Sequence, residues 1–226
     1  MLLIVGAVVV LACVRAAEGQ APIPARPDGW AVGPPGAPVV VDMFLDLMCP
    51  DCRADDPIIT QLARHYGDRV RIVYHVFPLP YHRNAFAMAQ LAHYIGNRLN
   101  TTGFLKWKTG AFAVQDSFGN QATSDLSQDD VNSRLADVVA QHVGIDKESA
   151  LAALKDGQFD WATRVSWKYA CSRAVSGTPT YLVNGVNAFS NEQRTLDAWI
   201  ALIDGLLLGS GHKSLSEDNE RTTASS

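Results

Sequence analysis

The stretch VVVDMFLDLMCPDC, residues 39–52, combines a strand pattern with two cysteines that are separated by two residues. Residues 39–45 are apolar at nearly every position, which is typical of a strand covered on both faces in a parallel α/β sheet. Apolar residues then recur with helical spacing from Cys52 to Tyr66. We therefore expect Cys49 and Cys52 to lie where a buried strand turns into a helix.

The sequence around this stretch predicts an α/β protein. Residues 70–77 (VRIVYHVF) read as a second strand and complete a βαβ unit, and residues 29–32 read as a short edge strand. Residues 81–175 have a helical pattern, with helices expected at 84–96 and 104–114, a Ser127/Asp130 capping pair before a helix at 131–143, and Asp146 as a cap for a helix at 150–154. Residues 180–183 are a strand, Asn184-Gly185 is a hairpin signal, and a last helix follows from Asn191.

The expected order is thus βαβ, a helical insertion, then ββα. The expected parts are a signal peptide at 1–19, the first part of the α/β domain at 20–80, the helical insertion at 81–175, the second part of the domain at 176–209 and a disordered tail at 210–226.

Composition indicates a globular protein with one core. The chain has 226 residues, of which 47% are hydrophobic and 19% charged. Its formal net charge is −4, which gives no attraction to a phosphate backbone. We expect no nucleic-acid partner.

The first residues indicate export. Residues 1–14 are almost wholly apolar and small residues follow up to Gly19, as in a cleaved signal peptide. Two alternatives stay open, an uncleaved anchor and lipid attachment at Cys13. With cleavage, we expect no stable membrane insertion and a secreted, extracellular or periplasmic location.

Export leaves Cys49, Cys52 and Cys171, so at most one intramolecular pair forms. Cys171 reads as a buried apolar residue, with a regulatory or intermolecular thiol as the alternative. A Cys-X-X-Cys pair alone fits zinc binding, redox chemistry or an inert surface bridge. A structural zinc site normally needs a second pair of ligands, which the lone Cys171 and the scattered histidines do not provide.

The redox interpretation has support from the helix. A cysteine at a helix N-terminus is stabilised as the thiolate, which is the nucleophile in disulfide exchange. Cys49 has this place, Cys52 lies one turn in, and Pro50 suits the first helical position. The expected redox group is a Cys49–Cys52 disulfide, with no other cofactor and no metal.

A second motif, Ser176-Gly177-Thr178-Pro179-Thr180, precedes the predicted hairpin. A proline at the start of an apolar strand is awkward unless its peptide bond is cis. We expect a cis Thr178–Pro179 bond.

Together, CPDC on a strand-to-helix turn and GTPT before a ββα end resemble the thioredoxin superfamily, in its DsbA-like branch. The resemblance covers about residues 30–208. It implies a thioredoxin fold, with Cys49 as nucleophile, Cys52 as resolving cysteine and Pro179 facing them. It also implies that the Thr178 backbone binds an extended substrate segment. Residues 77–82 (FPLPYH) are further similar to secreted eukaryotic DsbA-like proteins.

Two positions depart from the pattern of this family. Where many relatives have a buried acidic residue, six positions before the nucleophile, this chain has Met43, and the adjacent Asp42 should face the other side of the strand. Asp51 stands where the strongest oxidants of the branch have His, so we expect a modulating residue that makes the pair a weaker oxidant.

The expected function is thiol-disulfide exchange with unfolded or cysteine-containing proteins, supported by an unidentified redox partner. Two alternatives stay open: a slowly turning-over folding-assistant module and an enzyme resembling kappa-class glutathione transferases. His75, in the middle of a strand, and His82, after a Pro-rich turn, read as structural histidines, with a place at the border of the active site as the alternative. Asn100 begins a glycosylation sequon, which is relevant only in a eukaryotic secretory pathway.

Overall fold

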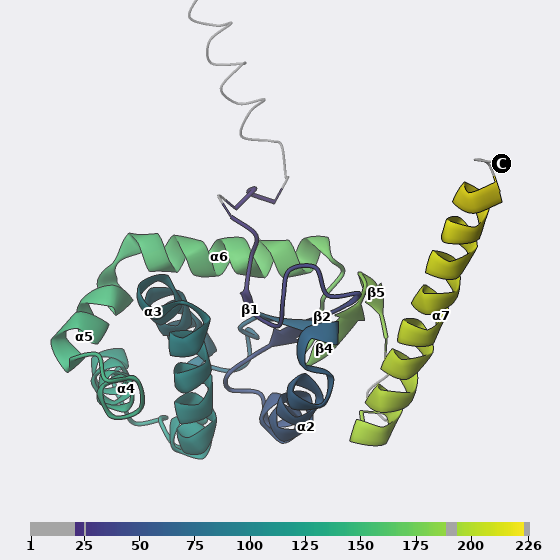
Figure 1. The fold of residues 1–226 in the computed structure, drawn as a ribbon. Coiled ribbons are helices and arrows are strands. Elements are labelled where there is room, and N and C mark those ends of the chain that lie inside the picture. The colour runs from purple at the N-terminus through teal and green to yellow at the C-terminus, as the bar shows by residue number, and fades with distance from the viewer. Residues whose placement is uncertain (1–20, 25, 189–193, 224–226) are drawn as a thin grey trace, which may run out of the picture.

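The computed structural model describes residues 21–24, 26–188 and 194–223, so the predicted signal peptide and Cys13 lie outside the described residues. A central sheet has α2 on one face and α6 on the other, while α3, α4 and α5 group together beside it (Figure 1). The strands are β1 (Trp30–Val32), β2 (Val39–Leu45), β3 (Val70–Val76), β4 (Thr180–Val183) and β5 (Val186–Asn187). The helices are α2 (Pro50–Tyr66), α3 (Ala85–Val114), α4 (Gln128–Val143), α5 (Lys147–Lys155), α6 (Gly157–Ser172) and α7 (Leu196–Thr223), with short 3-10 turns η1 (Gly67–Arg69) and η2 (Gln115–Phe118).

The sheet has the strand order β1-β3-β2-β4-β5. The predicted βαβ unit is present, because β2 and β3 are parallel and α2 connects them. The other described strand pairs are antiparallel, so the sheet is mixed rather than parallel throughout. A strand like β2, which is apolar except for Asp42, fits this sheet equally well, because it lies at the centre and both of its faces are covered.

Side chains of β2 alternate between two apolar clusters. Val41, Met43 and Leu45 belong to the main core, which includes Cys52 and the apolar residues of α2. Phe44 belongs to a smaller cluster with residues of α6 and β4, such as Ala170 and Leu182. The CPDC segment begins four residues after the end of this doubly buried strand, which fixes its position.

The helical insertion forms as its sequence predicts, with one difference. The capping pair Ser127 and Asp130 forms a reciprocal capping box on α4, and Asp146 caps α5. The helices predicted for residues 84–96 and 104–114 both form, as the two parts of α3, and the difference is that the interruption between them is a kink at Asn100 (φ 55°, ψ −155°) rather than a longer gap.

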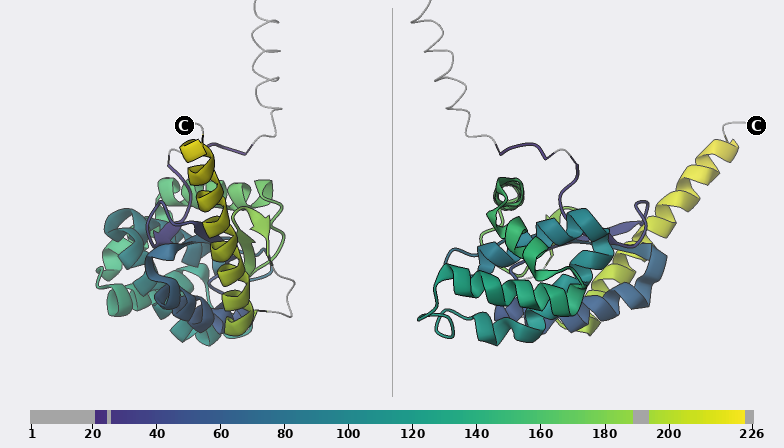
Figure 2. Two further views of the ribbon diagram at one scale, coloured as in Figure 1. Left: turned by 45° about the vertical axis from the view of Figure 1, so that its right-hand side comes forward. Right: turned by 90° about the vertical axis from the view of Figure 1, so that its left-hand side faces the viewer.

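The C-terminal part returns to the sheet. Asn184 and Gly185 both have positive φ, as a two-residue hairpin turn requires. Helix α7 contacts α2, where Tyr66 Oη donates to Asp204 at 2.8 Å. Its far end projects beyond the rest of the molecule (Figure 2). This helix includes residues 210–223, which the sequence predicts to be a disordered tail.

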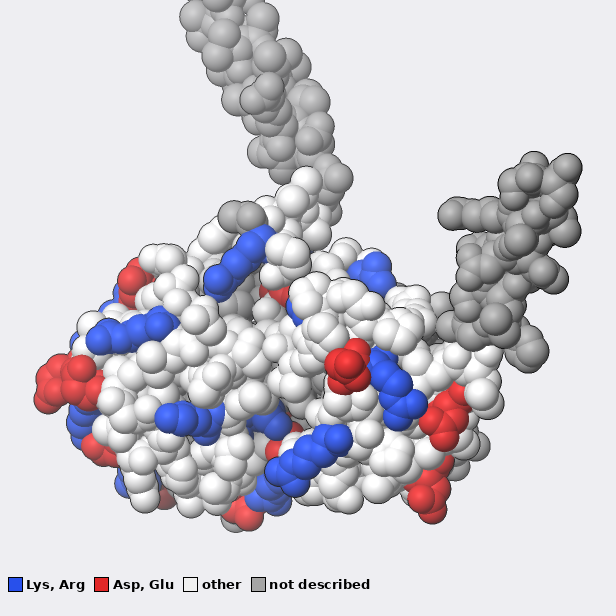
Figure 3. Space-filling view, in the orientation of Figure 1, with Lys and Arg blue, Asp and Glu red and all other residues white. Residues whose placement is uncertain are grey.

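Basic and acidic side chains are interspersed on the face of the molecule that Figure 3 shows.

The predicted order of βαβ, helical insertion and ββα is confirmed, while the exact domain limits stay predictions.

Candidate active site

Cys49 is the N-cap residue of α2, with an extended backbone (φ −80°, ψ 121°). Its backbone N–H donates to the carbonyl oxygen of Asp46 at 3.0 Å, which closes the loop between β2 and the helix. Pro50 occupies the first helical position, as predicted. The Cys49 side chain therefore lies at the end of α2 where unpaired backbone N–H groups favour negative charge.

The two cysteines have opposite pKa shifts. A hydrogen bond from Cys52 is the main cause that lowers the pKa of Cys49 to about 6, and Thr178 and the backbone N–H groups of Cys52 and Asp51 act in the same direction against burial. Burial raises the pKa of Cys52 far above its usual value, and the neighbouring Cys49 raises it further. Both are free thiols in the structure. These opposite shifts favour the thiolate form of Cys49, with Cys52 as its hydrogen-bond donor.

The second sequence motif meets the first at this point. Cys49 Sγ lies 3.4 Å from the carbonyl oxygen of Thr178, and the Thr178–Pro179 peptide bond is cis, the isomer that the sequence predicts. The pairing of β2 with β4, in which Phe44 lies opposite Thr180, brings the two segments together. The structure thus places Cys49, Cys52 and Thr178 in one site, and their roles in exchange stay predictions.

The two predicted modulating residues are at the surface. The side chains of Pro50 and Asp51 are exposed. The backbone N–H of Asp51 helps to lower the pKa of Cys49. The effect of the Asp51 carboxylate on Cys49 stays a prediction.

Position 43 provides no carboxyl group to the site, because it is a methionine, as the sequence indicates. Met43 is fully buried in the core beside the cysteines. Asp42 points to the opposite face of the sheet, where its Oδ1 lies 3.1 Å from His75 Nε2. Asp42 is therefore not a proton carrier for Cys52.

Sequence reasoning missed three polar side chains that hold the cysteine loop. Gln115, after α3, donates from Nε2 to the carbonyl oxygens of Leu47 (2.9 Å) and Cys49 (3.0 Å). Asp46, three residues before Cys49, is buried and bonds His82 at 2.7 Å. The only signal for Asp46 was its position at the end of a buried strand. His82 was noted only as an alternative neighbour of the site, and Gln115 carried no signal, because both residues meet the loop through the tertiary fold.

A further buried carboxylate lies one helical turn after Cys52. Asp55 Oδ2 accepts a hydrogen bond from Tyr181 Oη at 2.9 Å and is 2.8 Å from Arg194 Nε. Burial raises the pKa of Asp55, and its two partners oppose that rise. The contact with Tyr181 joins α2 to β4. Because Cys49 lies at the start of α2 and Thr178 lies just before β4, this contact helps to hold the two residues at a constant distance.

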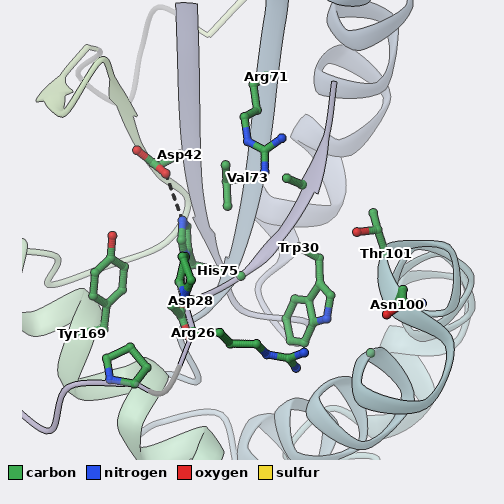
Figure 4. Close-up of a pocket in the computed structure, with 15 residues that line it drawn as sticks. Arg26, Asp28, Trp30, Asp42, Arg71, Val73, His75, Asn100, Thr101 and Tyr169 are labelled. Carbon is green, nitrogen blue, oxygen red and sulfur yellow. Dashed lines mark hydrogen bonds and ion pairs between the residues drawn. The ribbon is translucent and has the colours of Figure 1, made fainter. Parts of the chain in front are cut away.

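His75 is a structural histidine, as predicted. It lies on the other face of the sheet, between Asp28 (Nδ1 to Oδ2, 2.7 Å) and Asp42. Figure 4 shows the three side chains at a hollow that Trp30 and Tyr169 also line. Ser166 donates to the other oxygen of Asp28. Both ring nitrogens of His75 and both carboxylate oxygens of Asp28 have partners, and the group ties the N-terminal segment to the sheet and to α6.

Cys171 is less buried than the sequence predicts. It is half-buried on α6 and packs against the smaller core cluster, and burial raises the pKa of its thiol. Asn100 is exposed at the break in α3. Neither residue lies among those that contact the two cysteines.

Among the described residues, no group of three or more histidine, cysteine or acidic side chains is arranged to hold a metal ion. Likewise, none of the described helices is long and apolar enough to cross a membrane.

Comparisons with known proteins agree with this geometry. A family model described as thioredoxin matches residues 25–205. Similar solved structures include alpha-DsbA1 of Wolbachia pipientis, with a TM-score of 0.68 at 18% identity over 85% of this chain and 96% of that one. A putative protein-disulfide isomerase of Pseudomonas syringae has a TM-score of 0.64 at 18% identity, over 78% of this chain and 98% of that one. BdbD of Bacillus subtilis has a TM-score of 0.63 at 16% identity, over 79% and 92%. A comparison with curated protein sequences finds no match.

Proposed function

We propose that this chain, which belongs to the thioredoxin superfamily and has a DsbA-like fold, exchanges disulfides with cysteine-containing protein substrates through Cys49 and Cys52. One observation carries the proposal. At the N-terminus of α2, the pKa of Cys49 is lowered to about 6 while that of the adjacent Cys52 is raised. Such a difference in pKa is expected between a nucleophilic cysteine and its resolving partner, and it is not expected between two chemically inert thiols.

The exchange proceeds in two displacements. The Cys49 thiolate attacks one sulfur of a substrate disulfide, forms a mixed disulfide and releases the other sulfur as a thiolate that takes up a proton. Cys52 then loses its proton and attacks Cys49 Sγ, which forms the Cys49–Cys52 disulfide and releases the second substrate thiol. Two electrons pass from the protein to the substrate. The reverse sequence oxidises a substrate dithiol and leaves Cys49 and Cys52 reduced.

The environment of Cys49 suits an extended peptide. The residues before β4 run past Cys49 Sγ, and the backbone of Thr178 is positioned to pair with a substrate segment as an added strand. A groove also lies beside His82. Its lining combines apolar side chains, such as Leu79, Trp161 and Trp167, with the basic side chains of Arg164 and Lys168. Unfolded proteins expose the apolar side chains that such a groove accommodates.

The compartment follows from the predicted signal peptide at 1–19. Disulfide exchange of this kind operates where disulfides persist, outside the cytosol. We therefore place the mature chain in the secretory pathway, the extracellular space or a periplasm. A separate redox partner would return Cys49 and Cys52 to their starting state. Mass spectrometry of the secreted protein tests cleavage near Gly19.

The test of the proposed function uses the full mature chain with insulin as a disulfide substrate and a reduced, unfolded protein as a dithiol substrate. Cys49→Ser should abolish turnover. Cys52→Ser should retain the first displacement and accumulate mixed disulfides, which a non-reducing gel detects. Cys171→Ala is the matched control, because it removes a thiol outside the site. Binding of unfolded protein without turnover by the unmodified chain would overturn the proposal in favour of a binding module.

A further inference from the structure

The structure joins the cysteine loop to the segment between β3 and α3 through one buried carboxylate. Asp46 is 1% exposed. Its Oδ1 accepts from Met48 N (2.8 Å), and its Oδ2 accepts from Leu79 N (3.0 Å) and His82 Nδ1 (2.7 Å). Three donors on one carboxylate are what a buried charge requires. Asp46 is therefore a fixed anion directly beneath the loop that carries Cys49.

A second anion forms close by when Cys49 ionises. Asp46 is three residues before Cys49, and the backbone of the two residues is joined by the bond from Cys49 N to Asp46 O. A fixed carboxylate so near a thiolate disfavours that thiolate unless a positive charge compensates. The side chain in contact with Asp46 that can take up a positive charge is His82, which is 19% exposed.

Because of this arrangement we infer that His82, held by Asp46, is a positioning residue for the exchange reaction: its imidazolium offsets the buried carboxylate and stabilises the Cys49 thiolate. The inference rests on the proposed function. A stabilised thiolate favours the reduced pair over the disulfide, which makes the protein a stronger oxidant. Position 51, between the two cysteines, is an aspartate and brings no positive charge. His82 supplies that charge from another segment of the chain.

The electrostatics of the site support this assignment. The hydrogen bond to Asp46 is the largest cause that raises the pKa of His82, and Cys49 raises it as well. An interaction that favours the imidazolium when Cys49 is charged must favour the thiolate equally when His82 is charged.

The other charged and titratable groups around His82 do not replace it. Burial raises the pKa of Tyr81, so its phenol is neutral, and Asp51 carries the wrong sign. Two cations of α6, Arg164 and Lys168, line the groove beside His82, but neither is among the hydrogen-bond partners of the Asp46 carboxylate, and Arg164 is ion-paired with Asp160. Arg83 donates to the carbonyl oxygens of Thr123 and Leu126.

His82→Asn tests the inference, because the Asn amide can still donate to Asp46 but carries no charge. The pKa of Cys49 in the reduced protein should rise by about half a unit to one unit, read from the thiolate absorbance. The pKa values of Cys52 and Cys171 are raised, so the first absorbance step belongs to Cys49. The equilibrium constant against glutathione should shift three- to tenfold toward the disulfide, about 15–30 mV at 29.6 mV per factor of ten. His65→Asn, on the exposed side of α2, is the matched control and should change neither value.

A measurement on the unmodified protein tests the same coupling without a substitution. Oxidation removes the Cys49 thiolate, so the NMR-detected pKa of His82 should fall on oxidation by the amount that Cys49 gains in His82→Asn. An unchanged His82 pKa between the two redox states, or an unchanged Cys49 pKa in the variant, overturns the inference while leaving exchange activity intact. Loss of exchange in the unmodified protein would instead overturn the proposed function.

Discussion

Cys49 Sγ lies 3.4 Å from the carbonyl oxygen of Thr178, although the two residues are separated by the whole helical insertion. The contact arises because β2 leads into Cys49 and β4 begins just after Pro179, and these strands are neighbours in the sheet. In the proposed reaction, a substrate sulfur bound to Cys49 would therefore lie beside the backbone of Thr178. The same sheet pairing positions the nucleophile and the proposed substrate strand.

The rate of exchange should follow the ionisation of Cys49. The pKa of this thiol is lowered to about 6, and only the thiolate attacks. The second-order rate constant of the reduced protein with a small disulfide should rise about tenfold per pH unit below that value and level off above it. Stopped-flow measurements over this range check the profile. A midpoint near the usual thiol value of about 8.5 would show that the site does not stabilise the thiolate.

Removal of Cys171 should leave turnover unchanged. Its half-buried thiol packs on the smaller core cluster and lies outside the group around Cys49. Cys171→Ala should cost about 1 kcal/mol of stability through lost packing. Turnover and urea denaturation of the same sample separate the two effects. A tenfold loss of rate in a folded variant would assign Cys171 a part in the reaction.

Loss of His75 should destabilise the fold strongly and spare the chemistry. His75→Ala leaves the buried carboxylate of Asp28 facing Asp42 without a cation between them, at a cost of about 3–5 kcal/mol. Urea denaturation measures the loss, and the activity of the folded fraction should be retained. His75→Gln, which keeps a donor, should cost less; equal losses in both variants would assign the effect to packing.

The same histidine makes stability depend on pH. Burial opposes ionisation of His75, but its bonds to Asp28 and Asp42 outweigh burial and raise its pKa. Its stabilising contribution is therefore complete below the pKa of histidine in the unfolded chain, about 6.5, and is lost as pH rises through the higher folded value. The difference in the free energy of unfolding between the unmodified protein and His75→Ala should therefore become smaller as the pH rises.

Local patterns predicted most of the elements. The strand-to-helix turn at Cys49, the capping box of Ser127 and Asp130, and the Asn184-Gly185 turn each have a signal within a few residues. The kink of α3 at Asn100 falls in the gap between the helices predicted for residues 84–96 and 104–114.

Contacts between distant segments could not be predicted in this way. His82 lies 36 residues from Asp46, and Gln115 lies 66 residues from Cys49. Each partner is an ordinary polar residue in its own segment, and only the path of the helical insertion brings it to the cysteine loop. The sequence therefore located the two thiols but gave His82 a structural interpretation.

The charge of the exposed side chain at position 51 should change the pKa of Cys49 and the reduction potential of the Cys49–Cys52 pair. The Asp51 side chain is exposed, while its backbone N–H supports the Cys49 thiolate and is retained in any substitution except proline. The carboxylate repels the thiolate, Asn removes the repulsion, and a protonated His reverses it. The pKa of Cys49 should therefore fall in the order Asp, Asn, His, by about half a unit per step at low salt. Because exposed charges are screened, the steps should shrink as ionic strength rises, whereas the backbone contribution should not. Thiolate titrations of the three forms at low and high salt, with potentials against glutathione, check the series. An unchanged or reversed order would mean that Asp51 affects Cys49 through its backbone alone.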